Sequence, residues 1–271
     1  MRVALGQFGA RPGDVEGNLA RTRSLLERAA AGGAALACFP ELCLSGYLLD
    51  RDAYTGALLA AVEAARRTLA GDARRLGVAV VYGAPVGHGG ELANTVVLQP
   101  PDAAALDYAK THLDVKERAI FSPGSELVVG PGGIGLACCY DVAFPEASRV
   151  LALRGARVVV APMAWEVARG FVMQRVVAAR AVENVAYVVC VNQSGPAGEL
   201  RFLGASCVID PLGEVVMALG AGAALGFADL DLEWVDRLRG GRDGRTYPLL
   251  DDRRPDLYGE LHTMSETGLV P

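Results

Sequence analysis

The sequence predicts a single-domain α/β protein, in which two β-sheets pack face to face and helices cover both outer faces. The order of the elements predicts this fold: strands and helices alternate early, strands follow strands in the middle, and both patterns then recur. Hydrophobic residues make up 52% of the 271 residues and charged residues 21%, so a sizeable core can be buried. No linker divides the chain, so residues 1–271 are expected to form one domain.

In the first half of the chain, short apolar runs predict strands and leucines at helical spacing predict a helix. The leucine repeat lies in "NLARTRSLLERAAAGG", and the pair Gly32-Gly33 ends that helix. Pro40 stops the short apolar run "ALACFPE". The expected elements are, in order, strand 2–8, helix 18–33, strand 35–41, helix 54–76 and strands 77–85, 93–99 and 106–113.

The second half begins after a loop over residues 114–126 and repeats the alternation of strands and helices. A Pro-Gly turn at 210–214 separates two strands near its end. The expected elements are strands 127–130 and 134–140, helix 144–156, strand 157–165, helix 171–184, strand 186–193, two strands within 203–219, and a strand and a helix within 226–240. From about residue 241 the tail is polar and irregular, and we expect it to cross the surface or reach a neighbouring subunit.

Composition limits the possible partners and the compartment. The net charge is −5 without long charged runs, which argues against a nucleic-acid partner. No run approaches the roughly 20 apolar residues of a membrane-spanning helix, and the N-terminal apolar run is too short for a signal peptide. We therefore expect a cytoplasmic protein with no membrane partner.

The six cysteines are most simply read as buried free thiols. They lie within or just beyond apolar runs, form no Cys-x-x-Cys pair, and have no histidine at metal-ligand spacing. A zinc site and a disulfide framework are both improbable on this pattern, so no metal and no cofactor are expected.

Three reactive side chains lie at or near the ends of predicted strands. Glu41 ends one strand, Lys110 lies within another, and Cys139 ends a third. A cysteine nucleophile acts as its thiolate, so another group must accept its proton. His112 is the histidine nearest to these strand ends and could form a Cys-His pair, whereas a buried carboxylate with a raised pKa could serve instead. Taken alone, Lys110 is more simply read as a solvated strand residue and Cys139 as a buried filler.

The segments around these residues together resemble the nitrilase, or carbon-nitrogen hydrolase, superfamily. The similar segments are "FPELCLSGY" (39–47), "YAKTHL" (108–113) and "CYDVAFPE" (139–146), and the likeness extends to "AARAVENVAYVVCVNQSG" (178–195) and "DPLGEVV" (210–216). It covers almost the whole chain in the right order. The resemblance implies a four-layer α-β-β-α sandwich with two mixed sheets, and a homodimer or higher oligomer.

The same resemblance implies a Glu-Lys-Cys triad of Glu41, Lys110 and Cys139. Cys139 takes the nucleophile's place because it directly precedes "YD", while Cys138 is expected to pack inward. Glu117 matches a second glutamate of the family, although a surface loop carboxylate remains an alternative. His112 is then expected to be a structural hydrogen-bonding residue.

The resemblance predicts hydrolysis of a small primary amide through a thioester, with release of ammonia and a carboxylic acid. Nitrile or N-carbamoyl amine hydrolysis by the same triad remains an alternative, as does a non-catalytic binding module with a degenerate site. The family's usual arginine is replaced by Ala143, and Met173 stands where many members carry an aromatic residue, which leaves the substrate's identity open. The expected substrate contacts are Tyr47, Tyr140, Met163, Ala164 and Trp165.

Overall fold

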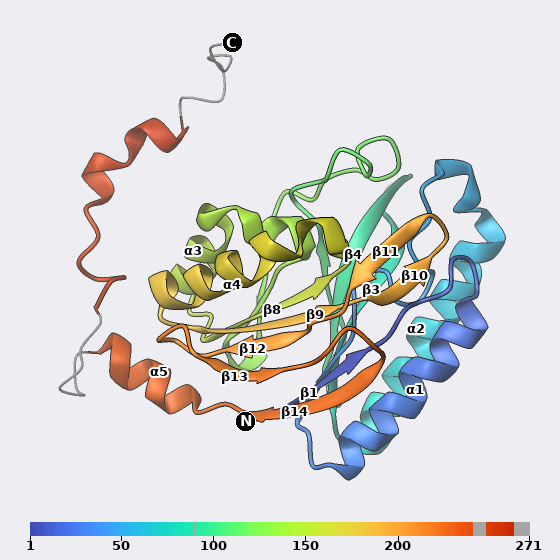
Figure 1. Ribbon diagram of the computed structural model, residues 1–271, viewed down its shortest axis with the longest axis horizontal. Coiled ribbons are helices and arrows are strands. Elements are labelled where there is room, and N and C mark those ends of the chain that lie inside the picture. The colour runs from blue at the N-terminus through green and yellow to red at the C-terminus, as the bar shows by residue number, and fades with distance from the viewer. Residues whose placement is uncertain (89, 241–247, 263–271) are drawn as a thin grey trace.

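The protein folds into two six-stranded mixed sheets, with helices on the outer side of each, as Figure 1 shows. The computed structural model describes residues 1–88, 90–240 and 248–262. The first sheet has the order β14-β1-β2-β3-β4-β5, and the second has the order β13-β12-β9-β8-β7-β6. The predicted α-β-β-α sandwich is thereby confirmed.

The strands of the two sheets follow the chain in two blocks. The first sheet contains β1 (Arg2–Gln7), β2 (Leu36–Cys38), β3 (Ala79–His88), β4 (Glu91–Gln99), β5 (Leu106–Ala109) and β14 (Ala224–Asp229). The second contains β6 (Val129–Gly130), β7 (Ile134–Leu136), β8 (Val158–Met163), β9 (Tyr187–Asn192), β12 (Cys207–Ile209) and β13 (Val215–Ala218).

Two helices cover each sheet. Helices α1 (Val15–Ala31) and α2 (Gly56–Leu76) pack on the first sheet, α3 (Pro145–Leu153) and α4 (Gly170–Asn184) cover the second, and α5 (Leu232–Arg239) follows β14 (Figure 1). The side chain of Asp14 caps α1 and that of Thr55 caps α2 by accepting from backbone N–H groups of the first turn. None of the described helices is both long and apolar enough to cross a membrane.

Strand alternation builds two separate layers of core. Val3 and Leu5 of β1 belong to the cluster between the sheets, where they share the core with Val160 of β8. Ala4, between them, faces the other way and packs with Leu26 of α1 and Leu69 of α2. Alternate side chains of β1 therefore pack in the interface between the two sheets and in the interface between the first sheet and its helices.

The direction of the strands determines where a site can form. Strands β1, β2 and β3 are mutually parallel, and so are β7, β8 and β9. Because β4 is antiparallel to β3 and β5 antiparallel to β4, strand β5 also ends at the edge where β2 and β3 end. Side chains just beyond β2, β5 and β7 can therefore gather at one edge.

The structure differs from the sequence-based expectations at several strand ends. The strands expected over 35–41, 106–113 and 134–140 end at Cys38, Ala109 and Leu136, so the reactive residues lie on the turns beyond them. A hairpin of β10 (Ser194–Ala197) and β11 (Leu200–Leu203) was not predicted. In the C-terminal tail, the short 3-10 helices η5 (Pro255–Leu257) and η6 (Gly259–His262) are described, and residues 241–247 and 263–271 lie outside the described chain.

Candidate active site

Cys139 lies at a sharp corner between β7 and α3. Its φ is 44°, a left-handed value that is uncommon for a residue with a side chain. It opens the 3-10 helix η3 (Cys139–Ala143), and its side chain lines a cavity of about 160 Å³. A strained corner that holds a thiol against a cavity is a geometry that suits a nucleophile.

Glu41 is held on the turn after β2 by the backbone around it. Its side chain is fully buried, and the next residue, Leu42, has a φ of 49°. Gly83 of β3 lies against this turn, where a Cβ would overlap the Leu42 amide nitrogen and lie 2.7 Å from the Cα of Glu41. Gln193 Nε2 donates to the Glu41 carbonyl oxygen at 2.9 Å. The turn is thus fixed by both sheets.

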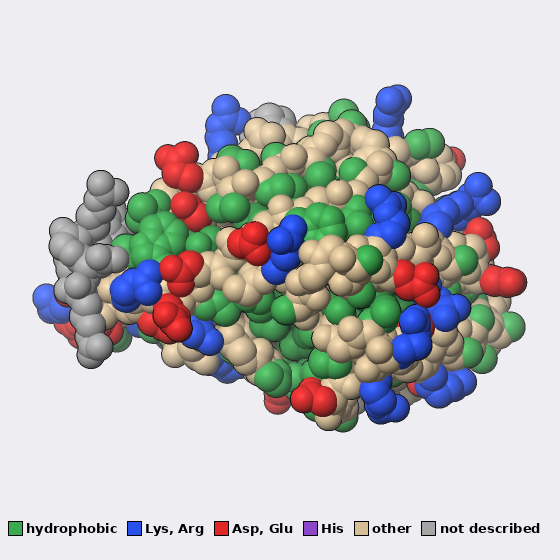
Figure 2. All heavy atoms as spheres, turned by 90° about the horizontal axis from the view of Figure 1, so that it is seen from below, with side chains coloured by type: hydrophobic (Ala, Val, Ile, Leu, Met, Phe, Trp, Pro, Cys, Tyr) green, Lys and Arg blue, Asp and Glu red, His purple; other side chains and the backbone are tan. Residues whose placement is uncertain are grey.

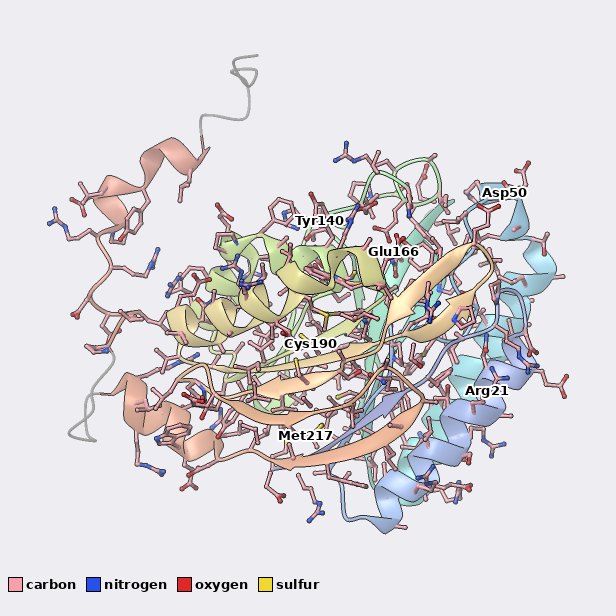
Figure 3. The ribbon with its side chains drawn as sticks, viewed as in Figure 1. Arg21, Asp50, Tyr140, Glu166, Cys190 and Met217 are labelled. Carbon is pink, nitrogen blue, oxygen red and sulfur yellow. The ribbon has the colours of Figure 1, made fainter. Side chains whose placement is uncertain are left out.

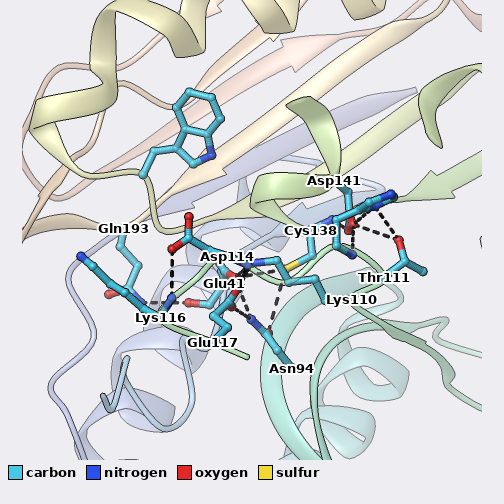
Figure 4. Close-up of polar contacts among 12 residues, drawn as sticks. Glu41, Asn94, Lys110, Thr111, Asp114, Lys116, Glu117, Cys138, Asp141 and Gln193 are labelled. Carbon is cyan, nitrogen blue, oxygen red and sulfur yellow. Dashed lines mark hydrogen bonds and ion pairs between the residues drawn. The ribbon is translucent and has the colours of Figure 1, made fainter. Parts of the chain in front are cut away.

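Lys110 lies between two buried carboxylates (Figure 4). Its Nζ donates to Glu41 Oε1 at 2.8 Å and to Glu117 Oε2 at 2.7 Å. Lys110 is 1% exposed and Glu117 fully buried, so the alternatives of a solvated lysine and a surface loop carboxylate are wrong. The backbone N–H of Lys110 donates to the Asn94 carbonyl oxygen, which continues the β5–β4 ladder by one residue.

Asn94 of β4 joins the two carboxylates from the other side. Its Nδ2 donates to Glu41 Oε1 at 2.7 Å and to Glu117 Oε1 at 2.8 Å. Glu41 Oε1 therefore accepts from both Lys110 and Asn94, while the buried Glu41 Oε2 has no hydrogen-bond partner among the described residues. The carboxylate is thus anchored by one oxygen and leaves the other available as a proton acceptor.

Cys138 also contacts this carboxylate, from the interior. Its Sγ lies 3.4 Å from Glu41 Oε1 and 3.9 Å from Asn94 Oδ1, and it is fully buried. The thiol with a hydrogen bond to Glu41 is thus that of Cys138, whereas the thiol on the cavity wall is that of Cys139. Since a substrate must reach the nucleophile, the geometry favours Cys139 and assigns Cys138 to the interior, where the sequence predicted it.

Burial and charge determine the protonation states of the site. Burial raises the pKa of the Cys139 thiol well above its ordinary value, and the charge of Glu41 raises it further, while Lys110 opposes both. Burial also raises the pKa of Glu41, and Lys110 limits that rise. Burial alone would lower the pKa of Lys110, but the charge of Glu41 holds it well above its ordinary value. The resting thiol is therefore protonated and needs a neighbouring base to ionise it.

His112 belongs to a different network from the cavity-lining thiol. Its Nδ1 lies 2.9 Å from Asp141 Oδ1, and its ring stacks on Phe144 with centroids 4.0 Å apart. Asp141 Oδ2 accepts from Tyr108 Oη at 2.7 Å and from the Cys138 N–H at 2.8 Å. Asp141 thus connects the segment that contains Lys110 to the corner that contains Cys139, and the contact with His112 helps to hold Asp141 in place.

Four of the five expected substrate contacts line the cavity, and the fifth does not. Tyr47, Tyr140, Ala164 and Trp165 line the cavity, as does Glu166, which is labelled with Tyr140 in Figure 3. The expectation for Met163 is corrected: it is the last residue of β8, is fully buried, and packs in the hydrophobic core instead of on the cavity wall. Met173 is likewise a core residue. Eight other lining residues were not predicted as contacts: Asp114, Lys116, Ala143, Glu166, Arg169, Val172, and Leu200 and Phe202 of the unpredicted hairpin.

All six cysteines are free and buried, as the sequence predicted for most of them. Among the described residues, no group of three or more His, Cys, Asp or Glu side chains is arranged to hold a metal ion.

Comparison with known proteins places this geometry in context. The model of the carbon-nitrogen hydrolase family matches residues 2–239. An "(R)-stereoselective amidase" from Pseudomonas sp is 38% identical over 269 residues, covering 96% of this chain and 94% of that protein. An amidase from Nesterenkonia sp. superposes with a TM-score of 0.84 at 34% identity, covering 96% of each chain.

A variant of the amidase from Nesterenkonia sp. AN1 was solved with covalent addition of the acetamide moiety of fluoroacetamide at its active site cysteine. It superposes with a TM-score of 0.83 at 34% identity, over 95% of each chain. All of these similarities extend over most of the chain.

Proposed function

The chain belongs to the carbon-nitrogen hydrolase family and is a hydrolase of non-peptide carbon–nitrogen bonds, and from that premise we propose that it hydrolyses small primary amides. Glu41, Lys110 and Cys139 form the proposed catalytic triad. The observation that carries the proposal is the Glu41 carboxylate, which is anchored through Oε1 and whose Oε2 has no hydrogen-bond partner within the described chain. The similarity of the whole chain to amidases supports an amide as the substrate.

In the first half of the proposed reaction, Glu41 accepts the proton of the Cys139 thiol. The thiolate attacks the amide carbonyl carbon, and the C=O electron pair moves onto oxygen. The Lys110 ammonium and the Tyr140 N–H stabilise that oxyanion. When the tetrahedral adduct collapses, the C–N bond breaks and Glu41 returns its proton to the leaving nitrogen, so ammonia departs and a thioester remains.

In the second half, Glu41 takes a proton from water as the water attacks the thioester carbonyl. Collapse of this second adduct breaks the C–S bond, the proton returns to Cys139, and the acid is released. One carboxylate therefore serves as base and acid in turn, which requires a pKa nearer to neutral than that of an ordinary glutamate. The burial of Glu41 raises its pKa in that direction. Glu117 positions Lys110 without touching the reacting atoms.

The test compares the two adjacent cysteines over a panel of aliphatic amides, ω-amides of dicarboxylic acids, N-carbamoyl amines and nitriles. Wild-type enzyme should release ammonia and acid in equal amounts from amides. Cys139→Ser should lose about 10⁴-fold or more in kcat/KM, whereas Cys138→Ser should keep much of its activity. Turnover of nitriles or N-carbamoyl amines without amides would replace the proposed reaction, and full activity of Cys139→Ser would remove the assigned nucleophile.

A further inference from the structure

The cavity beside Cys139 has an apolar wall and a charged rim. Six of the residues that form the wall are Tyr47, Ala143, Ala164, Trp165, Leu200 and Phe202. The ring centroids of Tyr47 and Phe202 lie 6.1 Å apart, so these two aromatic rings form one side of the cavity, next to the β10–β11 hairpin. This wall offers burial to an apolar group and few hydrogen bonds to a polar one.

The charged side chains of the rim neutralise one another. Lys116 Nζ lies 2.6 Å from Glu166 Oε1, and Arg169 Nη1 lies 2.7 Å from Asp114 Oδ2. Both pairs belong to residues that line the cavity. The rim therefore carries two cations and two anions and attracts neither sign of substrate.

The deeper part of the cavity also offers no free cation. Lys110 is the cation there, and it is already paired with both Glu41 and Glu117. Among the described residues that line the cavity, every lysine and arginine thus has a carboxylate within 2.8 Å. With Lys110 assigned to the reacting carbonyl, a substrate carboxylate buried elsewhere in this cavity would lose its hydration without gaining a partner.

The size of the cavity limits the group that fits. Its volume of about 160 Å³ is close to the roughly 150 Å³ of an apolar cavity that holds one benzene molecule. We infer, building on the proposed amide hydrolysis, that the preferred substrates carry a compact, uncharged, apolar acyl group. Amides with a carboxylate at the far end of the acyl chain are then poor substrates.

Two amides of equal size and shape test this inference. 4-Methylpentanamide and succinamate have the same number of heavy atoms, and an isopropyl group in the first replaces the carboxylate of the second. Wild-type enzyme should show a kcat/KM for 4-methylpentanamide that is at least roughly 100-fold higher, since a buried carboxylate without a partner is strongly disfavoured.

Glu166→Gln should lower the ratio of the kcat/KM for 4-methylpentanamide to that for succinamate. Glu166→Gln removes the partner of Lys116 and frees a cation at the rim, so the preference should shift about tenfold toward succinamate. Glu63→Gln is the matched control, because Glu63 forms ion pairs with Arg66 and Arg67 on exposed α2, away from the cavity lining. Its ratio should equal that of the wild type.

The outcomes separate the inference from the function on which it rests. Ammonia released from succinamate as fast as from 4-methylpentanamide would overturn the inference and leave amide hydrolysis standing. A ratio unchanged by Glu166→Gln would overturn the role given to the ion-paired rim. If neither amide, nor any other primary amide, released ammonia, the proposed function would fail and the inference with it.

Discussion

At the scale of single residues, the proposed chemistry depends on how the two oxygens of the Glu41 carboxylate differ. Oε1 accepts from Lys110, Asn94 and the Cys138 thiol, whereas Oε2 is buried without a partner among the described residues. Fixing one oxygen sets the direction of the other, so the donors to Oε1 orient the atom that takes the proton. Asn94 is therefore a positioning residue for the base.

Replacement of Asn94 should alter the pH profile as well as the rate. Glu41 must be ionised to accept a proton, so activity falls as the pH drops through its pKa, which burial has raised. The Asn94 hydrogen bond lowers that pKa, so Asn94→Ala should raise it and move the acid limb of kcat/KM to higher pH. We also expect a loss of roughly 10²-fold in kcat from misplacement of the carboxylate.

Thr95→Ala is the matched control for this change. Thr95 is the next residue of β4 and is also buried, but it donates to the Ala93 carbonyl and points to the opposite face. Its acid limb should coincide with that of the wild type. An acid limb that stays in place in Asn94→Ala would show that Asn94 does not act on Glu41.

The proposed reactive residues and Glu117 were recognisable in the sequence, whereas Asn94 was not. Glu41, Lys110 and Cys139 each follow an apolar run within a recognisable segment. Asn94 stands inside the apolar strand "ELANTVVLQ", and only the pairing of β3, β4 and β5 brings it against two carboxylates. The prediction of Met163 as a substrate contact was wrong. Its side chain is buried in the core, although those of its neighbours Ala164 and Trp165 line the cavity.

At the scale of elements, the turn after β2 depends on its close contact with β3. Gly83 permits that contact, since a Cβ there would overlap the Leu42 amide and crowd Glu41. Gly83→Ala should therefore displace the turn, lower the free energy of unfolding by roughly 1–3 kcal/mol, and reduce kcat. Chemical denaturation and steady-state kinetics measure the two effects.

Gly71→Ala is the control for this substitution. Gly71 lies inside α2, and a Cβ there would meet no heavy atom within 4 Å. Because alanine is the better helix former, this variant should gain up to about 1 kcal/mol and keep the wild-type kcat. A Gly83→Ala enzyme with unchanged kcat would contradict the link between the β3 contact and the catalytic carboxylate.

The elements were predicted well in type and less well at their ends. Helices α1 and α2 carry leucine and alanine repeats that identify them, whereas β2, β5 and β7 end several residues earlier than their apolar runs. Glu41, Lys110 and Cys139 lie just beyond these three strand ends. The β10–β11 hairpin was missed because its residues, "SGPAGELRFL", lack both a long apolar run and regular alternation.

At the scale of the whole molecule, charged groups are spread over the surface, and the described part of the tail exposes three large apolar side chains, those of Leu257, Tyr258 and Leu261. On the face shown in Figure 2, acidic and basic side chains are interspersed among apolar ones. In the described part of the tail, Leu257 and Leu261 are 66% and 67% exposed. Tyr258 and Leu261 line a shallow depression with Arg149 of α3. Apolar side chains held in water at this face favour self-association.

We therefore expect a homodimer that covers the face formed by α3 and the tail. Light scattering coupled to gel filtration should give twice the 28.3 kDa of one chain. The double substitution Leu257→Asp and Leu261→Asp should convert it to a monomer, because it places charges in the apolar contact. A wild-type protein that stays monomeric at micromolar concentration would contradict this expectation.

We propose that Glu41, and not His112, is the base that activates Cys139. The most direct test is intact-mass detection of the trapped thioester, with ammonia release, in Glu41→Gln and His112→Asn at several pH values. Both variants keep the size and much of the hydrogen bonding of the replaced side chain. We predict no thioester and a loss of roughly 10²–10⁴-fold in Glu41→Gln, with thioester and turnover retained in folded His112→Asn. An active Glu41→Gln beside a folded but inactive His112→Asn would instead assign the role of the base to His112.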